Sequence, residues 1–180
     1  MPRVMKWIAA LSTALTLLIV LLPVNMPAWV GITSGTIAYH FCMRLAVGAC
    51  YDLLMGNRAD YRRAWFRQKA FEPGLYRALG VQRWKAHMPT YAPELFDPKQ
   101  HSWDEIAQAM CQSELVHETI ALLSFLPLAA VRWFGALPVF LITSVLPALF
   151  DLSFAAIQRY NRPTVIRIAD REKRRSARKG

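Results

Sequence analysis

The sequence predicts an all-α integral membrane protein with four transmembrane helices and a cytoplasmic amphipathic loop between helices 2 and 3. The chain is 54% hydrophobic, and its apolar residues gather in long uncharged runs. Strongly basic stretches separate these runs, as in proteins that cross a membrane several times. The length of 180 residues suits one domain, which we place at residues 1–168, followed by a basic cytoplasmic tail at 169–180.

The first predicted span covers residues 7–22, an apolar run that follows Arg3 and Lys6. A cleaved signal peptide is the alternative reading of this run. Small residues would then mark a cleavage site, whereas Pro23 and Pro27 follow the run. We therefore interpret the run as an uncleaved span.

The second predicted span covers residues 28–54, after a short uncharged turn at residues 24–29. This span is the weakest of the four, because His40 and Arg44 lie within it at helical spacing. Polar groups at such depth usually face the interior of a helical bundle or a wet cavity. Arg44 has the alternative of extending its side chain to the headgroups.

The predicted cytoplasmic loop covers residues 56–109, where aromatic and basic residues interleave. Nine Lys or Arg residues fall in this loop, and four prolines divide it into short pieces. Such a composition is typical of short amphipathic helices on a membrane surface. The aromatic residues of this stretch include Trp65, Phe66, Phe71, Tyr76, Trp84 and Trp103.

The third and fourth predicted spans cover residues 115–131 and 137–157. Pro138 and Pro147 are expected to interrupt the fourth span, which membranes tolerate when neighbouring helices satisfy the freed backbone groups. Nine Lys or Arg residues follow Gln158, and we expect the end of this tail to be a partly disordered, lipid-facing extension.

Charge asymmetry predicts the orientation of the chain. The amino end, the central loop and the tail are basic, so both termini are expected in the cytoplasm. The Lys and Arg residues behind the net charge of +10 lie beside apolar spans. We therefore expect anionic membrane lipid to bind the basic loop and tail, and we expect no nucleic-acid partner.

The clearest candidate site begins at residue 110, where ionisable residues run into the third span. On a helix, Glu114, His117 and Glu118 share one face. An imidazole can take a proton from a hydroxyl near neutral pH, and a carboxylate can orient the ring. His117 with Glu114 would thus be a general base with its orienter. The alternative is an interfacial helix start with solvated polar side chains.

Two other polar blocks are expected on the same side of the membrane, at residues 84–89 and 158–163. Arg159, Asn161 and Arg162 suit an anionic or polyoxygenated group, such as a phosphate or a sugar. The predicted contact joins Glu114 to Arg159 or Arg162, because buried charges need partners. Convergence of the three blocks would form an active site.

No cofactor and no metal is predicted. Glu-x-x-His supplies ligands in di-iron bundles, but two copies are required there and the chain has one. Cys42, Cys50 and Cys111 form neither a C-x-x-C pair nor a zinc-type spacing, so no disulfide framework follows.

At these blocks the chain resembles the glycosyl-4,4'-diaponeurosporenoate acyltransferase family, small bacterial membrane proteins of carotenoid biosynthesis. The resemblance covers residues 71–168 and ends in the run QRYNRP at 158–163. A block like E-T-C-R-A-E-x-x-H corresponds to residues 109–117, with Ala109 and Gln112 as departures. By this resemblance, the substrate-binding residues are Glu72, Tyr76, Trp84, Lys85, Gln158, Arg159, Tyr160, Asn161 and Arg162, and Cys111, Glu114, His117 and Pro89 also match.

The resemblance implies transfer of a fatty acyl group to a hydroxyl, of a sugar by preference, on a lipid or glycolipid acceptor in the bacterial inner membrane. The expected partners are this acceptor and an acyl donor, with a membrane protein as a further candidate. One alternative is a membrane methyltransferase of the isoprenylcysteine type, which uses S-adenosylmethionine. Another is a non-catalytic small membrane subunit or assembly partner, in which the Ala109 and Gln112 departures would be natural.

Overall fold

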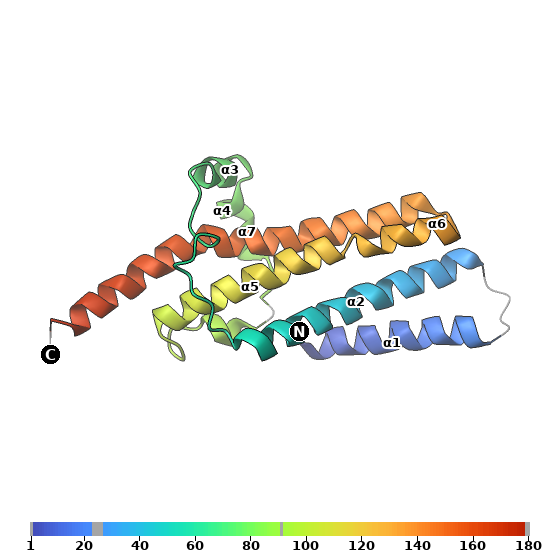
Figure 1. Cartoon of the computed structure of the whole chain (residues 1–180), viewed down its shortest axis with the longest axis horizontal. Coiled ribbons are helices and arrows are strands. Elements are labelled where there is room, and N and C mark those ends of the chain that lie inside the picture. The colour runs from blue at the N-terminus through green and yellow to red at the C-terminus, as the bar shows by residue number, and fades with distance from the viewer. Residues whose placement is uncertain (1, 23–26, 91, 179–180) are drawn as a thin grey trace. The chain divides into compact units, whose positions relative to one another are not determined.

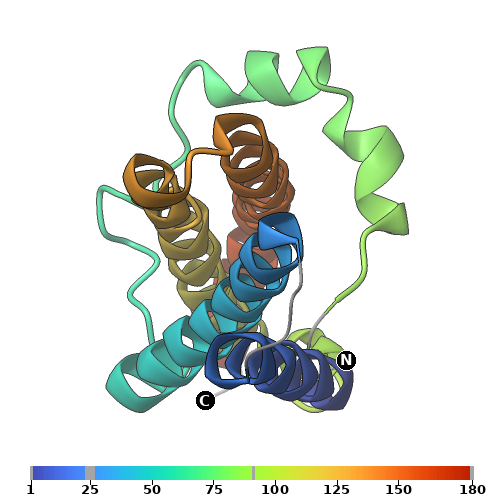
Figure 2. The same ribbon diagram turned by 90° about the vertical axis from the view of Figure 1, so that its right-hand side faces the viewer.

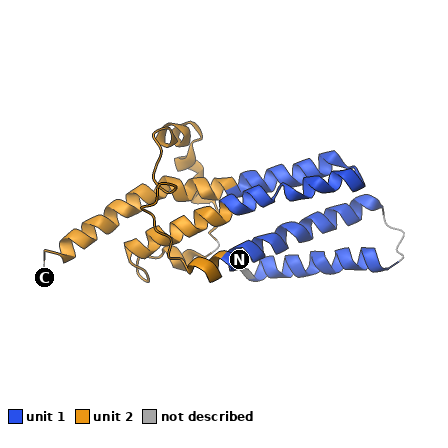
Figure 3. Ribbon diagram, in the orientation of Figure 1, with its two compact units in different colours: residues 1–50, 118–151 blue, residues 51–117, 152–180 orange. Residues whose placement is uncertain are grey.

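The computed structural model of the chain describes residues 2–22, 27–90 and 92–178. All regular structure in these residues is helical and none of it is β-strand, which confirms the all-α class. The chain forms two compact units: unit 1 comprises residues 1–50 and 118–151, and unit 2 comprises residues 51–117 and 152–180 (Figure 3). The single domain expected at residues 1–168 stays a prediction.

Unit 1 is a helical bundle. In Figures 1 and 2, α1 and α2 run side by side, and the Thr16 hydroxyl donates to the Ser34 hydroxyl across them at 3.3 Å. The expected turn at 24–29 between these helices lies largely outside the described residues. The bundle is built from α1 (Pro2–Leu21), most of α2 (Ala28–Met55), the end of α5 (Trp103–Leu123), η3 (Leu126–Ala130), α6 (Val131–Phe134) and the start of α7 (Leu137–Ser176).

Three described helical segments are long and apolar enough to cross a membrane: Arg3–Leu21, Trp103–Phe134 and Leu137–Ser176. The predicted count of four is wrong on this criterion, because α2 does not qualify. α2 has 28 residues, ample for a span, but His40, Arg44 and several hydroxyl residues lower its hydropathy. The fold is consistent with a membrane protein.

Unit 2 has a small core in which the loop after α2 packs on α5 and α7. The buried residues of this core are Ala59, Tyr61, Phe66, Ala107 and Cys111, and Met55, Leu115, Val165 and Ile166 pack against them. Its short helices are α3 (Glu72–Ala78), α4 (Val81–Trp84), η1 (Lys85–His87) and η2 (Pro93–Phe96). The expected short helices of the loop are therefore present.

α5 begins at Trp103, twelve residues before the start predicted for the third span at Leu115. The cause is a capping box, in which the Ser102 N–H donates to the Glu105 carboxylate at 2.8 Å and the Glu105 N–H donates to the Ser102 hydroxyl at 3.3 Å. Acidic residues in the first turn also favour this helix start. The extension places Cys111, Glu114 and His117 well inside a helix.

α7 is one continuous helix from Leu137 to Ser176, so Pro138 and Pro147 do not interrupt it. Pro138 lies in the first turn, where a missing backbone N–H costs nothing. The disorder expected in the tail is wrong up to Ser176, because α7 simply continues. Lys173 supports this end by an ion pair with Asp104 at 2.5 Å.

Candidate functional site

Glu114 lies at the centre of the charged residues of unit 2 and is completely buried, with 0% exposure. Its two carboxylate oxygens accept from Arg159 and from Arg162, one oxygen for each guanidinium. The two arginines are three residues apart on α7 and therefore share a face. The expected contact between Glu114 and this block is thus present with both arginines.

A second carboxylate completes the arrangement. Arg159 donates from Nε to Glu72 Oε1 at 3.2 Å, and Glu72 is 3% exposed at the start of α3. We call Glu72, Glu114, Arg159 and Arg162 the charge network. Its two carboxylates balance its two guanidinium groups, which offsets the cost of burying charge.

The charge network also fixes the loop before α3. Arg162 donates to the Phe66 carbonyl at 2.8 Å, and Arg159 donates to the Trp65 carbonyl at 3.2 Å. The Arg162 guanidinium lies 5.2 Å from the centre of the Phe66 ring, a cation–π contact. Sequence reasoning missed this role of the loop, because backbone carbonyls leave no pattern in a sequence.

Tyr76 joins the charge network from α3. Its hydroxyl donates to Glu72 Oε2 at 3.2 Å, and the side chain is buried. Burial first, and then the negative charge of Glu72, raise the pKa of the Tyr76 phenol from 10.0 to about 12. Tyr76 therefore stays protonated at neutral pH and remains a hydrogen-bond donor.

A more accessible group of residues lies beside the charge network. Lys85 donates to Asn161 Oδ1 at 2.7 Å, and its Nζ lies 4.5 Å from the centre of the Tyr160 ring. The rings of Tyr160 and Tyr76 meet edge to face at 5.9 Å. Lys85, Tyr160 and Asn161 are half-buried, so a cation, a phenol and an amide are offered to a ligand.

His117 is half-buried on α5, and its ring stacks on Phe154 with a centroid distance of 4.7 Å and an interplanar angle of 16°. The ion pairs of Glu114 go to the two arginines. Orientation of His117 by Glu114 therefore stays a prediction, as does the catalytic role of His117.

Two of the expected binding residues stand apart from these contacts. The Trp84 indole N–H donates to the Leu79 carbonyl at 3.0 Å, which ties the short helices of the loop together. Gln158 is half-buried, and in the described part of the chain its side chain makes no hydrogen bond to the charge network. Binding roles for both residues stay predictions.

The two departures from the family block lie outside the charge network. Gln112 donates to Asp52 Oδ1 at 2.8 Å and accepts from the Asn57 N–H at 2.7 Å. Asn57 has φ of 60°, so Gln112 stabilises a left-handed turn that follows α2. Ala109 is buried at 4% exposure. Glu114 is paired with Arg159 and Arg162 with these two residues in place.

The described ranges contain no group of three or more His, Cys, Asp or Glu side chains that could hold a metal ion. Cys111 is fully buried in the core of unit 2.

Among the comparisons with known proteins, one matches the part of the chain that contains the charge network. No curated protein and no solved structure matches the chain. The family profile of glycosyl-4,4'-diaponeurosporenoate acyltransferase matches residues 62–171, which include the whole charge network and His117. The match covers more than half of the chain, so the protein belongs to the glycosyl-4,4'-diaponeurosporenoate acyltransferase family.

Proposed function

We propose that this protein transfers a fatty acyl group from a donor to a hydroxyl of a lipid or glycolipid acceptor, a sugar hydroxyl by preference. One observation carries the proposal: the family match includes every member of the charge network, and these side chains bond to one another. Family membership supports an acyltransferase and favours it over the methyltransferase and the non-catalytic subunit.

His117 is the proposed general base. In the step, the acceptor oxygen attacks the acyl carbonyl carbon while the imidazole takes the hydroxyl proton. The tetrahedral intermediate then collapses, the bond to the donor's leaving group breaks, and His117 returns the proton to that group. The outcome is an ester on the acceptor and a protonated leaving group.

The remaining residues divide by burial into two roles. Glu114 and Arg162 are almost fully buried and bond to each other, so their role is to hold α5, α7 and the loop in register. Lys85, Tyr160 and Asn161 are half-buried and carry donors and acceptors, which suits contact with sugar hydroxyls. Glu72 and Tyr76 fix the orientation of Arg159 between these two groups.

The test is product formation. The full chain, purified in lipid nanodiscs, is incubated with a labelled acyl donor and a glycolipid acceptor, and the products are identified by mass spectrometry. The proposal expects an acyl ester on a sugar hydroxyl. Transfer of a labelled methyl group from S-adenosylmethionine would instead indicate a methyltransferase, and no turnover with any donor would favour the subunit reading.

We propose that the protein lies in the bacterial inner membrane with both termini in the cytoplasm, because its amino end, loop and tail are basic. Anionic lipid at these basic surfaces is part of the same proposal. If both termini lie on one side of the membrane, the chain crosses it an even number of times. The same experiment therefore tests whether α2 crosses the membrane in addition to the three qualifying segments. Labelling of cysteines introduced near each end, in intact and in permeabilised cells, checks this. Labelling of only one end in intact cells would contradict it.

A further inference from the structure

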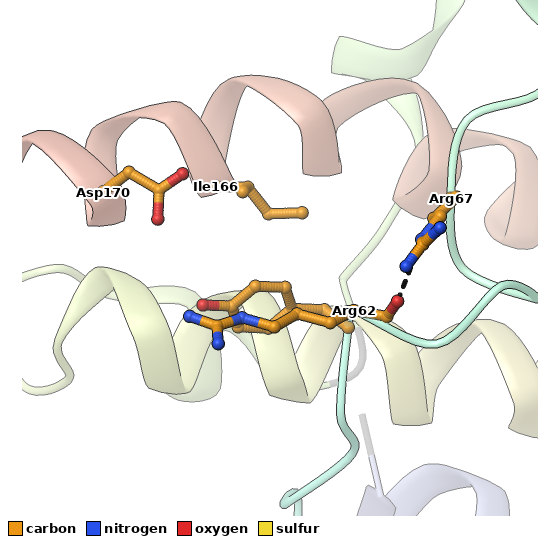
Figure 4. Close-up of a pocket in the computed structure, with 5 residues that line it drawn as sticks. Arg62, Arg67, Ile166 and Asp170 are labelled. Atoms are coloured by element: carbon orange, nitrogen blue, oxygen red, sulfur yellow. Dashed lines mark hydrogen bonds between the residues drawn. The ribbon is translucent and has the colours of Figure 1, made fainter.

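A shallow groove of about 290 Å³ opens on unit 2, and no residue of the charge network lines it (Figure 4). Arg62 and Arg67 come from the loop before α3, and Ile166 and Asp170 come from α7. Tyr61 completes the lining. The groove thus has a basic side on the loop and a side with one apolar and one acidic residue on the helix.

The basic side of the groove is held in place by its own hydrogen bonds. Arg67 donates from Nε to the Arg62 carbonyl at 3.0 Å, and the Arg62 N–H donates to Asp60 Oδ1 at 2.9 Å. Tyr61 is buried, and its hydroxyl donates to Asp104 at 2.7 Å. The two arginines therefore project from a fixed turn.

Neither Arg62 nor Arg67 forms an ion pair within the residues that the structure describes. Asp170 is therefore paired with neither of them. This contrasts with Arg159 and Arg162, whose guanidinium groups are paired with carboxylates. The groove thus offers two available guanidinium groups beside the apolar side chain of Ile166.

We propose that this groove binds a phosphate group carried by an amphiphilic ligand. Guanidinium groups match the geometry and charge of phosphate oxygens, and Arg62 and Arg67 supply them. Ile166 contacts the apolar part of the ligand. Asp170 opposes the bound anion and leaves the groove with a net charge of about +1, so binding is moderate and reversible.

Two ligand sources share this chemistry. One is a coenzyme A thioester serving as the acyl donor, and this identification rests on the proposed function. The other is an anionic phospholipid, which requires no acyl transfer. Arg67 directly follows Phe66, whose carbonyl accepts from Arg162, so the groove and the charge network share one loop. The loop that carries Arg62 and Arg67 is therefore held by the charge network.

The test measures binding to the purified full chain without any turnover. Coenzyme A and inorganic phosphate are titrated into the chain in detergent micelles, and retained phosphatidylglycerol is counted by native mass spectrometry with phosphatidylcholine as the reference. The R62Q/R67Q variant should weaken binding about tenfold or more. The matched control R77Q/R83Q removes two exposed arginines of the same loop and should change affinity less than about twofold.

A third variant separates this site from general loss of folding. Asp170→Asn removes the opposing charge and should tighten binding of the same anion about threefold, a gain that misfolding cannot produce. Preference for coenzyme A or for phosphatidylglycerol identifies the source, and either supports the proposal. Equal weakening in the two double variants, weaker binding by Asp170→Asn, or no binding of any probe would overturn it.

Discussion

Unit 1 holds many of its hydroxyl side chains by local bonds, whereas the buried charges of unit 2 bond across separate parts of the chain. In unit 1, several hydroxyls donate to a carbonyl four residues earlier in the same helix at 2.7 to 2.8 Å. These donors are Ser12, Thr16, Thr36, Ser124 and Thr143. In unit 2, the charge network joins residues from three separate parts of the chain, such as Glu72 with Arg159. Local bonds permit an apolar surrounding, whereas long-range bonds define one tertiary arrangement.

The surfaces of the two units differ in how many large apolar side chains they expose. Most of the large exposed apolar side chains belong to unit 1, for example Trp7, Leu11 and Trp133. Unit 1 also contains a long-range ion pair, between Arg44 and Asp151, both largely buried. Unit 1 thus exposes an apolar surface that is compatible with lipid, while unit 2 concentrates the groups that can carry chemistry.

Removal of the central carboxylate should give the largest effect on stability. Glu114→Gln leaves Arg159 and Arg162 without their shared charge partner, and breaking such a buried pair costs about 3–5 kcal/mol. Thermal unfolding of the purified chain in detergent measures this loss. The control is Thr36→Val in unit 1, where only a bond within one helix is lost and a smaller change is expected. Equal losses would remove the distinction between the units.

Tyr76 gives a prediction that depends on pH. The pKa of its phenol is raised to about 12 in the folded chain, against 10.0 for an unperturbed tyrosine. Its contribution to folding free energy should therefore be fully present below pH 10 and decline as pH rises from about 10 to 12. Denaturant titrations across this range should show the decline in the wild type and a smaller one in Tyr76→Phe. Identical profiles would show that folding does not raise the pKa of the Tyr76 phenol.

Ser102→Ala should produce the smallest effect. The variant removes the capping hydroxyl of α5 and should lower stability by about 1 kcal/mol. Ser102→Asp, which preserves the cap, serves as the control and should stay close to wild type. Denaturant unfolding monitored by helicity checks both variants, and an unchanged Ser102→Ala would mean that α5 is fixed by packing alone.

Much of unit 1 could be predicted from the sequence, because long apolar runs indicate long helices. The exception is α2, where composition indicates a membrane span only weakly and the hydropathy criterion excludes it. The start of α5 was also predictable in principle, since Ser102 followed by Glu105 is a capping-box pattern. The continuity of α7 through Pro147 was not, because tertiary packing overrides local helix propensity.

The ion pairs of the candidate site were predictable, because a buried charge needs a partner of opposite charge. Glu114 and the arginines of residues 158–163 had to find partners if buried, and they do. The sequence did not predict that both arginines would share Glu114, nor that Gln112 would bond Asp52 instead of joining them. Such choices depend on how α5, α7 and the loop are packed, which no local pattern specifies.

We propose that unit 2 performs acyl transfer with His117 as the base. The most direct measurement is turnover per folded molecule of purified His117→Ala, with His101→Ala as the matched control, since His101 lies in the loop before α5. We expect His117→Ala to lose about 100-fold to 10,000-fold in turnover with little change in thermal stability, and His101→Ala to keep wild-type turnover. Wild-type turnover by His117→Ala would contradict the claim.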